Sequence, residues 1–358
     1  MAIASPLPRR VPVAPDDDRK HIARWLFVVC GMIVAMVLIG AITRLTESGL
    51  SIMEWAPVTG FLPPMSDGEW QRLFALYQQT PEYQQINAGM DVASFKTIFW
   101  WEWVHRFWGR LIGLIYLVPL VVFLARRRIP AGLTKHLIFG FILGGAQGAL
   151  GWFMVASGLG DRTDVSQYRL AAHLALALAI YLYLLWLAIG CVRAPASRVW
   201  PGLKPQLILL FMLIALTVTM GAFTAGLDAG FIYNEFPTMG GAFVPGEAFA
   251  LEPAWRNIFE NPVTAQLVHR WLAIGTAAAI LFVWWRAPHG TETLSRKRPV
   301  DLLAAMALVQ VALGIVTLLS VVWLPLAVLH QAGAVALLSF ALWAIYEARP
   351  MPGIGRTK

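Results

Sequence analysis

Long apolar runs that are nearly free of charge recur along the whole sequence. They lie at 25–43, 99–125, 137–157, 170–192, 205–227, 262–285 and 302–346. A helix needs roughly 20 apolar residues to cross the hydrocarbon core of a bilayer. The last run is about twice that length and is broken near 320–325, so it predicts two helices joined by a tight turn. The sequence therefore predicts eight transmembrane helices.

The composition excludes the soluble classes of protein. Apolar residues make up 58% of the chain and charged residues only 13%, against about 25% charged in a typical soluble domain. The two cysteines, Cys30 and Cys191, fall in different predicted spans, which excludes a disulfide scaffold. The net charge is +8, but nucleic-acid binding would need a folded basic face with aromatic readers. We therefore expect no nucleic-acid partner.

The charged residues are sorted by side of the membrane. Most of the 28 Lys and Arg residues lie in the two tails and in the short connections, as in Arg126–Arg128 and Arg296–Arg298. Most of the acids lie in the long connections 44–97 and 228–261. Basic connections stay on the cytoplasmic side, so both termini are predicted to be cytoplasmic and the long loops to face outward. The first apolar run is too long for a signal peptide, and we expect a multi-pass protein of the inner (plasma) membrane.

The two halves of the sequence repeat each other. The matching segments are Gly40-Ala-Ile-Thr with Gly221-Ala-Phe-Thr, Val104-His-Arg with Val268-His-Arg, Gln147–Gly151 with Gln310–Gly314, and His173–Trp186 with His330–Trp343. Each half has an even number of spans, so the repeats run parallel. The predicted fold is an all-α polytopic membrane protein with eight transmembrane helices in two pseudo-symmetric four-helix bundles.

This repeat also sets the expected domain boundaries. The predicted units are a cytoplasmic tail 1–24, an N-terminal bundle 25–192, a cytoplasmic linker 193–204, a C-terminal bundle 205–346 and a cytoplasmic tail 347–358.

Four of the seven histidines lie inside predicted spans, two in each repeat: His105, His173, His269 and His330. Each comes soon after the outer end of its span, so all four are expected at one depth near the outer face. Two facing histidines in a four-helix bundle can ligate a heme iron axially. A lone histidine there is more often a hydrogen-bonding residue, and zinc prefers a fuller ligand set. The pattern predicts one axial pair for heme in each bundle.

The halves differ beside the first histidine. Glu102 precedes His105 by three residues and shares its helix face, whereas Gln266 stands at the equivalent place before His269. A carboxylate in the membrane is costly and marks a functional site by default. The alternative is an acid that reaches out to water.

Two further features carry open alternatives. Arg106 and Arg270 are predicted either to bind heme propionates or to reach lipid phosphates. In the longer first outward loop, Ser66–Glu69 forms a capping box before Trp70–Tyr77, where apolar residues recur at helical spacing. This predicts an amphipathic helix over the first bundle, as a lid or as an interfacial anchor.

Taken together, these motifs resemble the heme A synthase family over essentially the whole chain. The motifs are Gly40–Ser51, Trp103–Arg110, Ala172-His173, Gln266–Arg270 and Leu329-His330-Gln331. The resemblance implies oxidation of the C8 methyl group of heme O to a formyl group, which makes heme A for cytochrome oxidase.

The resemblance also implies a division of labour between the halves. Heme b is implied at His269 and His330, and substrate heme O at His105 and His173, with Glu102 required for activity. The first outward loop lacks the cysteine pair of some bacterial members, which places the sequence with the proteobacterial and mitochondrial branch. Beyond heme O and membrane lipid, the logic of the pathway points to a heme O synthase and cytochrome oxidase assembly proteins as partners, and a homo-oligomer is an open alternative.

Under this hypothesis Glu102 stabilises positive charge on the substrate or accepts a proton. Two hydroxylations give a hydroxymethyl group and then a gem-diol, and heme b carries the electrons away. The alternative is a di-heme membrane cytochrome for quinol-linked electron transfer, and a heme or small-solute transporter is a third class.

Overall fold

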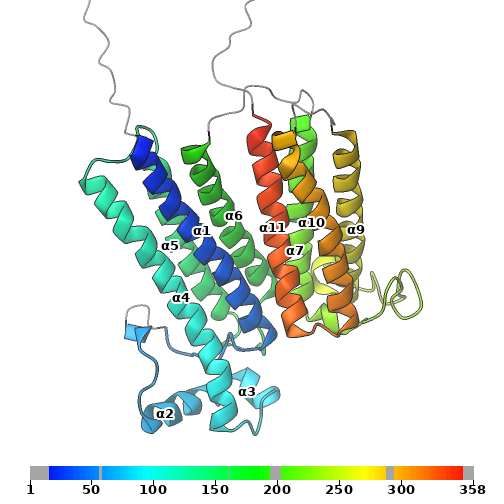
Figure 1. The fold of residues 1–358 in the computed structure, drawn as a ribbon. Coiled ribbons are helices and arrows are strands. Elements are labelled where there is room, and N and C mark those ends of the chain that lie inside the picture. Colours follow the sequence, from blue (N-terminus) through cyan, green and yellow to red (C-terminus); the bar gives the residue numbers. More distant parts are fainter. Residues whose placement is uncertain (1–15, 56–58, 161, 194–202, 288–293, 350–358) are drawn as a thin grey trace, which may run out of the picture.

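The computed structural model describes residues 16–55, 59–160, 162–193, 203–287 and 294–349 (Figure 1). In chain order the elements are α1 (Asp16–Leu45), η1 (Thr59–Phe61), α2 (Asp67–Tyr77), α3 (Pro81–Gln85), α4 (Val92–Ala125), α5 (Thr134–Val155), α6 (Gln167–Val192), α7 (Leu203–Gly226), η2 (Ala229–Phe231), α8 (Arg256–Glu260), α9 (Pro262–Arg286), α10 (Leu294–Leu319) and α11 (Leu324–Glu347). Eight of them are long and apolar enough to cross a membrane: α1, α4, α5, α6, α7, α9, α10 and α11. The all-α prediction and the eight spans are confirmed, and the chain is a multi-pass membrane protein.

Local sequence sets where the spans begin and end. α9 starts at Pro262, whose fixed φ suits a first helical turn, and the Asn261 side chain accepts the N–H groups of Val263 and Thr264. The predicted break in the last apolar run is also present. There, α10 ends at Leu319 and α11 begins at Leu324, with a proline in its first turn.

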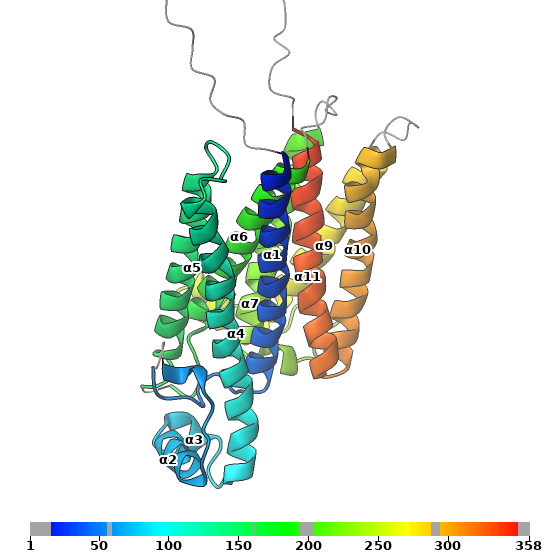
Figure 2. The same cartoon turned by 60° about the vertical axis from the view of Figure 1, so that its left-hand side comes forward.

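The spans form two groups with the same pattern of neighbours. In the first group α1 packs against α4 and α6, and α5 packs against the same two helices. In the second group α7 packs against α9 and α11, and so does α10. The groups meet through α6 with α7, α1 with α11, and α6 with α11 (Figures 1 and 2). This pattern is compatible with the two predicted bundles related by a pseudo-two-fold axis.

The outer surface of the spans is apolar because it faces lipid. Large side chains such as Val118, Leu209 and Phe282 are exposed on it, as expected where hydrocarbon replaces water. The first turn of α1 and the last turn of α11 lie at the same end of the molecule (Figure 1). Residues 1–15 and 350–358 of the predicted tails and 194–202 of the linker lie outside the described residues, whereas 16–24 form the start of α1. The domain boundaries and the side of the membrane remain predictions.

The amphipathic helix predicted in the first outward loop is confirmed as α2. The Ser66 hydroxyl accepts the N–H of Glu69, as the capping box predicts. The buried residues of α2 are Trp70, Leu73, Phe74 and Tyr77.

α4 begins earlier than the apolar run that predicted it, at Val92 instead of residue 99. At 34 residues it is about 51 Å long, and its first turns project beyond the other spans (Figures 1 and 2). α2 packs on these turns, where Phe95 and Phe99 are buried against it. Protein contacts therefore take the place of lipid around this end of α4.

Candidate functional site

Each of the four span histidines packs against a glycine of the preceding span. The pairs are His105 with Gly40, His173 with Gly151, His269 with Gly221, and His330 with Gly314. A Cβ atom on the glycine would lie 3.0–3.2 Å from the ring carbon Cε1 in every pair. Each glycine lies about one turn before the end of its helix. The four rings therefore occupy equivalent places relative to the helix before each of them, and their common depth in the membrane stays a prediction.

In the second group the two rings face each other closely. The ring centres of His269 and His330 are 6.4 Å apart and their planes are perpendicular. Two metal–imidazole bonds of about 2.0 Å each, with the reach from nitrogen to ring centre, give a separation of roughly 6 Å. These two residues therefore fit an iron bound between them. Within the described residues no group of three or more His, Cys, Asp or Glu is placed to hold a metal ion.

His269 is held in one orientation by a backbone contact. Its Nδ1 lies 3.1 Å from the carbonyl oxygen of Thr217. A ring that donates Nδ1–H to a carbonyl keeps Nε2 for a metal. Sequence reasoning missed this contact because a carbonyl acceptor leaves no mark in the residue types.

The second histidine of each group contacts a glutamine. Gln310 Nε2 donates to the His330 carbonyl oxygen at 2.8 Å and lies 3.2 Å from its Nδ1. Gln147 Nε2 makes the same contacts with His173 at 3.1 and 3.2 Å. Both glutamines belong to the repeated Gln-x-Ala-Leu-Gly segment, so the repeat carried a signal for this role.

His105 differs from its counterpart His269. Its Nδ1 is buried and has no hydrogen-bond partner among the described residues. It interacts electrostatically with His173, and the pairing of these two rings on one iron stays a prediction. A buried polar atom without a partner is costly. Without a hydrogen bond at Nδ1, the ring of His105 is held less firmly in one orientation than the ring of His269.

Glu102 is a buried acid beside His105. It is 3% exposed, and its Oε1 lies 2.6 Å from Arg106 Nε. The carboxylate therefore does not reach out to water. Its counterpart Gln266 is equally buried but donates to the carbonyl of Tyr233. The equivalent positions thus hold a charged pair in one half and a neutral amide in the other.

The two arginines hold the outward loops. Arg106 donates to the carbonyls of Ile52 and Glu54 at 2.9 and 3.1 Å. Arg270 donates to the carbonyls of Tyr233, Glu235 and Thr238 in the second loop. Arg270 Nε is buried without a partner within the described part of the chain, so one donor remains for an anionic group. Binding of propionates by either arginine stays a prediction.

A charged cluster at the end of the spans nearest the four histidines was not predicted. Arg44 Nη2 lies 2.8 Å from a carboxylate oxygen of Asp164 and of Asp228, and it joins the two groups of helices. Nearby Glu82 of α3 is buried. Burial and the charges of Glu47 and Asp164 raise the pKa of Glu82 to about 8.

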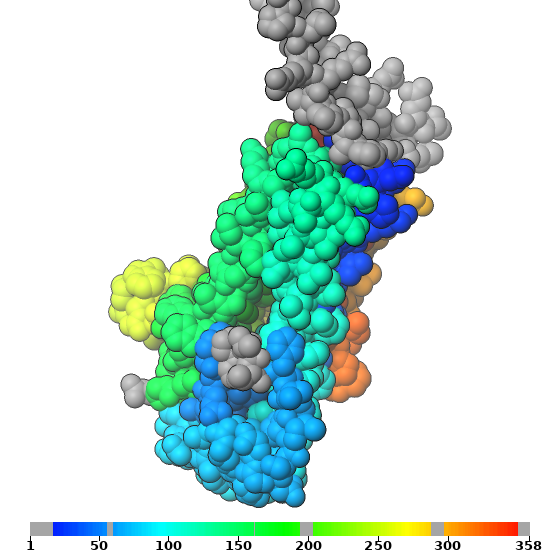
Figure 3. Space-filling view, turned by 90° about the vertical axis from the view of Figure 1, so that its left-hand side faces the viewer, coloured from blue at the N-terminus to red at the C-terminus, as the bar shows by residue number. Residues whose placement is uncertain are grey.

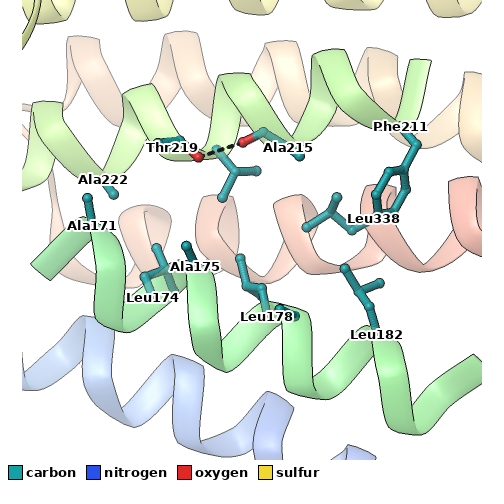
Figure 4. Close-up of a pocket in the computed structure, with 12 residues that line it drawn as sticks. Ala171, Leu174, Ala175, Leu178, Leu182, Phe211, Ala215, Thr219, Ala222 and Leu338 are labelled. Carbon is teal, nitrogen blue, oxygen red and sulfur yellow. Dashed lines mark hydrogen bonds between the residues drawn. The ribbon is translucent and has the colours of Figure 1, made fainter. Parts of the chain in front are cut away.

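An apolar cavity of about 320 Å³ lies between α6 and α7 (Figure 4). Among its lining residues are Ala175, Leu178, Ala215 and Leu338. The hydroxyl of Thr219, which also lines it, donates to the carbonyl of Ala215. No histidine lines this cavity, so it is separate from the ring pairs.

Comparison with known proteins gives one consistent result. A family described as cytochrome oxidase assembly protein matches residues 23–342. The chain is 49% identical to the heme A synthase of Rhodospirillum centenum over 346 residues, which cover 96% of this chain and 91% of the relative. It is 47% identical to that of Parvibaculum lavamentivorans (95% and 98% covered) and 45% identical to that of Nitrosospira multiformis (92% and 94%).

Proposed function

The chain belongs to the family of cytochrome oxidase assembly proteins, and from this premise we propose that it is a heme A synthase. The proposed reaction is oxidation of the C8 methyl group of heme O to a formyl group, through hydroxymethyl and gem-diol stages. The relatives that carry this name match nearly the whole chain, so the proposal rests on both halves of the molecule.

The observation that carries the proposal is the difference between two equivalent sites. In the second site His269 is oriented by the Thr217 carbonyl, and the adjacent residue is the neutral Gln266. In the first site His105 Nδ1 has no hydrogen-bond partner among the residues that the structure describes, and the adjacent residue is the buried Glu102. A resident cofactor needs fixed ligands, whereas a substrate site must exchange its occupant. The second site therefore suits a permanent heme and the first site suits chemistry.

His269 and His330 would hold heme b, which supplies one-electron transfer when bound. Thr217 and Gln310 orient these imidazoles, and such outer contacts are typically worth 10–100-fold in metal affinity. The buried Nε of Arg270 offers a donor for a propionate.

In the first site His105 and His173 bind the iron of heme O, and Glu102 performs the protein's part of the chemistry. Oxidation of a methyl group at the macrocycle edge develops positive charge there. A buried carboxylate stabilises that charge or accepts a proton from water or from the hydroxymethyl group. Arg106 balances the carboxylate charge while it is buried.

The proposed setting is the inner membrane, with both termini cytoplasmic and both heme sites near the outer face. A heme O synthase would deliver the substrate, and cytochrome oxidase assembly would take up the product.

Replacing Glu102 by Gln tests the proposal, because it gives the first site the residue that the second site has. We expect heme A production to fall by about 100-fold or more, the range of general acid–base catalysis, while heme O accumulates. Hemes extracted from membranes and identified by mass provide the measurement. The control is Glu69→Gln on α2, where the acid is at the surface. Undiminished heme A would remove Glu102 from the mechanism.

Deleting the protein separates this function from a di-heme cytochrome. A synthase leaves heme O in place of heme A when it is absent. A cytochrome for electron transfer leaves the heme composition of the membrane unchanged, and that result would contradict the proposed function.

A further inference from the structure

The second outward loop exposes a set of large apolar side chains. They are Phe231, Ile232, Phe236, Phe243, Val244, Phe249 and Trp255. The first loop packs the aromatic residues of α2 against α4, although it also exposes Trp55, Leu62, Met65 and Ile86. An exposed apolar set of this kind marks a surface that contacts lipid or another protein.

The loop is fastened to the side of a membrane-spanning helix. Arg270 of α9 donates to the carbonyls of Tyr233, Glu235 and Thr238 at 2.7–3.2 Å. This arginine lies about 12 Å along α9 from the helix start at Pro262. The loop therefore runs beside the span and not only above it. Figures 1 and 3 show it projecting sideways, in yellow-green to yellow.

The tip of the loop continues the lipid-facing surface of α9. The ring of Phe243 contacts that of Trp271, with centroids 6.3 Å apart. Trp271 is 44% exposed on a span, and such exposed span surface faces lipid. Phe243 and Val244 are 60% and 58% exposed next to it.

The backbone at the tip forms its own hydrogen bonds. Met239 and Ala242 exchange N–H···O=C bonds of 2.7 and 3.3 Å across a turn. Gly240 and Gly241 occupy that turn at φ +65° and +76°, where glycine avoids the strain of a side chain. Backbone groups must be satisfied internally wherever water is scarce, and Met239 and Ala242 meet that condition by pairing with each other.

A carboxylate limits how deep the loop lies. Glu235 accepts hydrogen bonds from Thr238 and from the N–H of Gly241, and these bonds lower its pKa. An ionised acid belongs with lipid headgroups and water, whereas aromatic rings favour the interface just below. The two requirements are met when Glu235 lies among headgroups and the tip points inward.

We propose that segment 235–244 is inserted into the phospholipid leaflet on the histidine side of the membrane, with Phe243 and Val244 among the acyl chains. The segment is an interfacial anchor that fixes the depth of α9. This inference stands on the loop geometry alone and does not depend on the proposed function.

Spin labels test the depth directly. The full chain with Cys30→Ala and Cys191→Ser receives one label, at Phe243→Cys or at Val244→Cys, and is reconstituted into phosphatidylethanolamine–phosphatidylglycerol vesicles. Collision rates with oxygen and with a nickel chelate are measured. The lipid reference is Val118→Cys, exposed on span α4, and the water reference is Asp67→Cys, exposed on α2.

We expect the ratio of oxygen to nickel collisions at 243 and 244 to exceed the Asp67 value several-fold and to approach the Val118 value. A ratio equal to that of Asp67 at both positions overturns the proposal, because the loop would then be open to water or to a protein partner. Elution of each labelled protein as one species, like the unlabelled chain, establishes that the compared proteins are folded. Two label positions guard against a local effect of one substitution.

Discussion

At the scale of single residues, four glycines decide how closely the histidine rings approach the neighbouring helix. Each ring lies where a side chain on the opposite helix would otherwise stand. The same contact occurs at both positions of both repeats, so the geometry belongs to the repeated unit. The halves then differ through other contacts, namely Thr217 with His269 and Arg106 with Glu102.

Gly314→Ala tests the close approach in the second site. The added Cβ would lie 3.0 Å from His330 Cε1, so the ring must shift and its bond to a metal is misaligned. We expect heme b affinity to fall by about tenfold or more, measured as heme bound per mole of purified protein. Gly275→Ala on α9 is the control, because a Cβ there has no heavy atom within 4 Å. Equal heme content in the two variants would contradict the role of Gly314.

At the scale of elements, α2 and α4 stabilise each other outside the main helix groups. Trp70 of α2 packs its ring against Phe99 of α4 at 4.9 Å and against Phe95 at 6.5 Å. Because α4 projects beyond the other spans, its first turns would be exposed without α2. The contact is hydrophobic, whereas the ion pairs of Arg72 on the same helix are solvent-exposed.

Trp70→Ala should therefore loosen this unit far more than Arg72→Ala. Truncating a buried Trp costs roughly 3–5 kcal/mol, and a surface ion pair contributes about 0–1 kcal/mol. Hydrogen exchange of the amides in 66–85, followed by mass spectrometry, measures the local opening. We expect much faster exchange in Trp70→Ala and little change in Arg72→Ala. Similar exchange in both variants would show that the aromatic packing does not hold α2.

At the scale of the whole molecule, polar contacts fasten the two helix groups at several depths. Tyr181 of α6 and Ser339 of α11 share a hydrogen bond of 2.8 Å in the interior. Arg44 joins Asp164 and Asp228 at the end nearest the four histidines. Glu82 of α3 interacts electrostatically with Arg44 and Asp164 of this cluster and forms a side-chain hydrogen bond with Tyr77. Because its pKa is raised, the charge of Glu82 changes near neutral to mildly basic pH.

The stability of the molecule should fall as the pH rises through about 8. Burial raises the pKa of Glu82, so the folded state binds a proton that the unfolded state has released, and this contribution is lost above the folded-state pKa. Glu82→Gln removes the charge and should stabilise the protein at pH 9 by on the order of 1–3 kcal/mol, with little effect at pH 5. Thermal unfolding at the two pH values measures this.

Glu54→Gln is the control of opposite sign. The pKa of Glu54 is lowered by Arg72. Its charged form therefore stabilises the folded state at pH values above the ordinary pKa of a glutamate, and neutralising it does not increase stability at pH 9. Stabilisation by Glu54→Gln, or none by Glu82→Gln, would contradict this account.

Several features were predictable from the sequence because they depend on neighbours along the chain. The spans follow from apolar runs of bilayer length, and the capping box of α2 and the break before Pro325 are local signals. The internal repeat predicted the paired histidines and the contrast of Glu102 with Gln266. The start of α4 was missed because its first turns lie outside the apolar run. They are covered by α2 and not by lipid, and this tertiary contact leaves no signal in the local sequence.

Eight membrane spans, one repeated unit and four histidines at equivalent positions all follow from the order of residues along the chain. What those positions contact follows from the packing of the helices. The Thr217 carbonyl contacts His269, 52 residues farther along the chain. Arg44 forms an ion pair with Asp228, 184 residues farther along. Such contacts depend on how the helices pack in space. The residue types alone do not show whether a backbone carbonyl or a carboxylate has a hydrogen-bond partner.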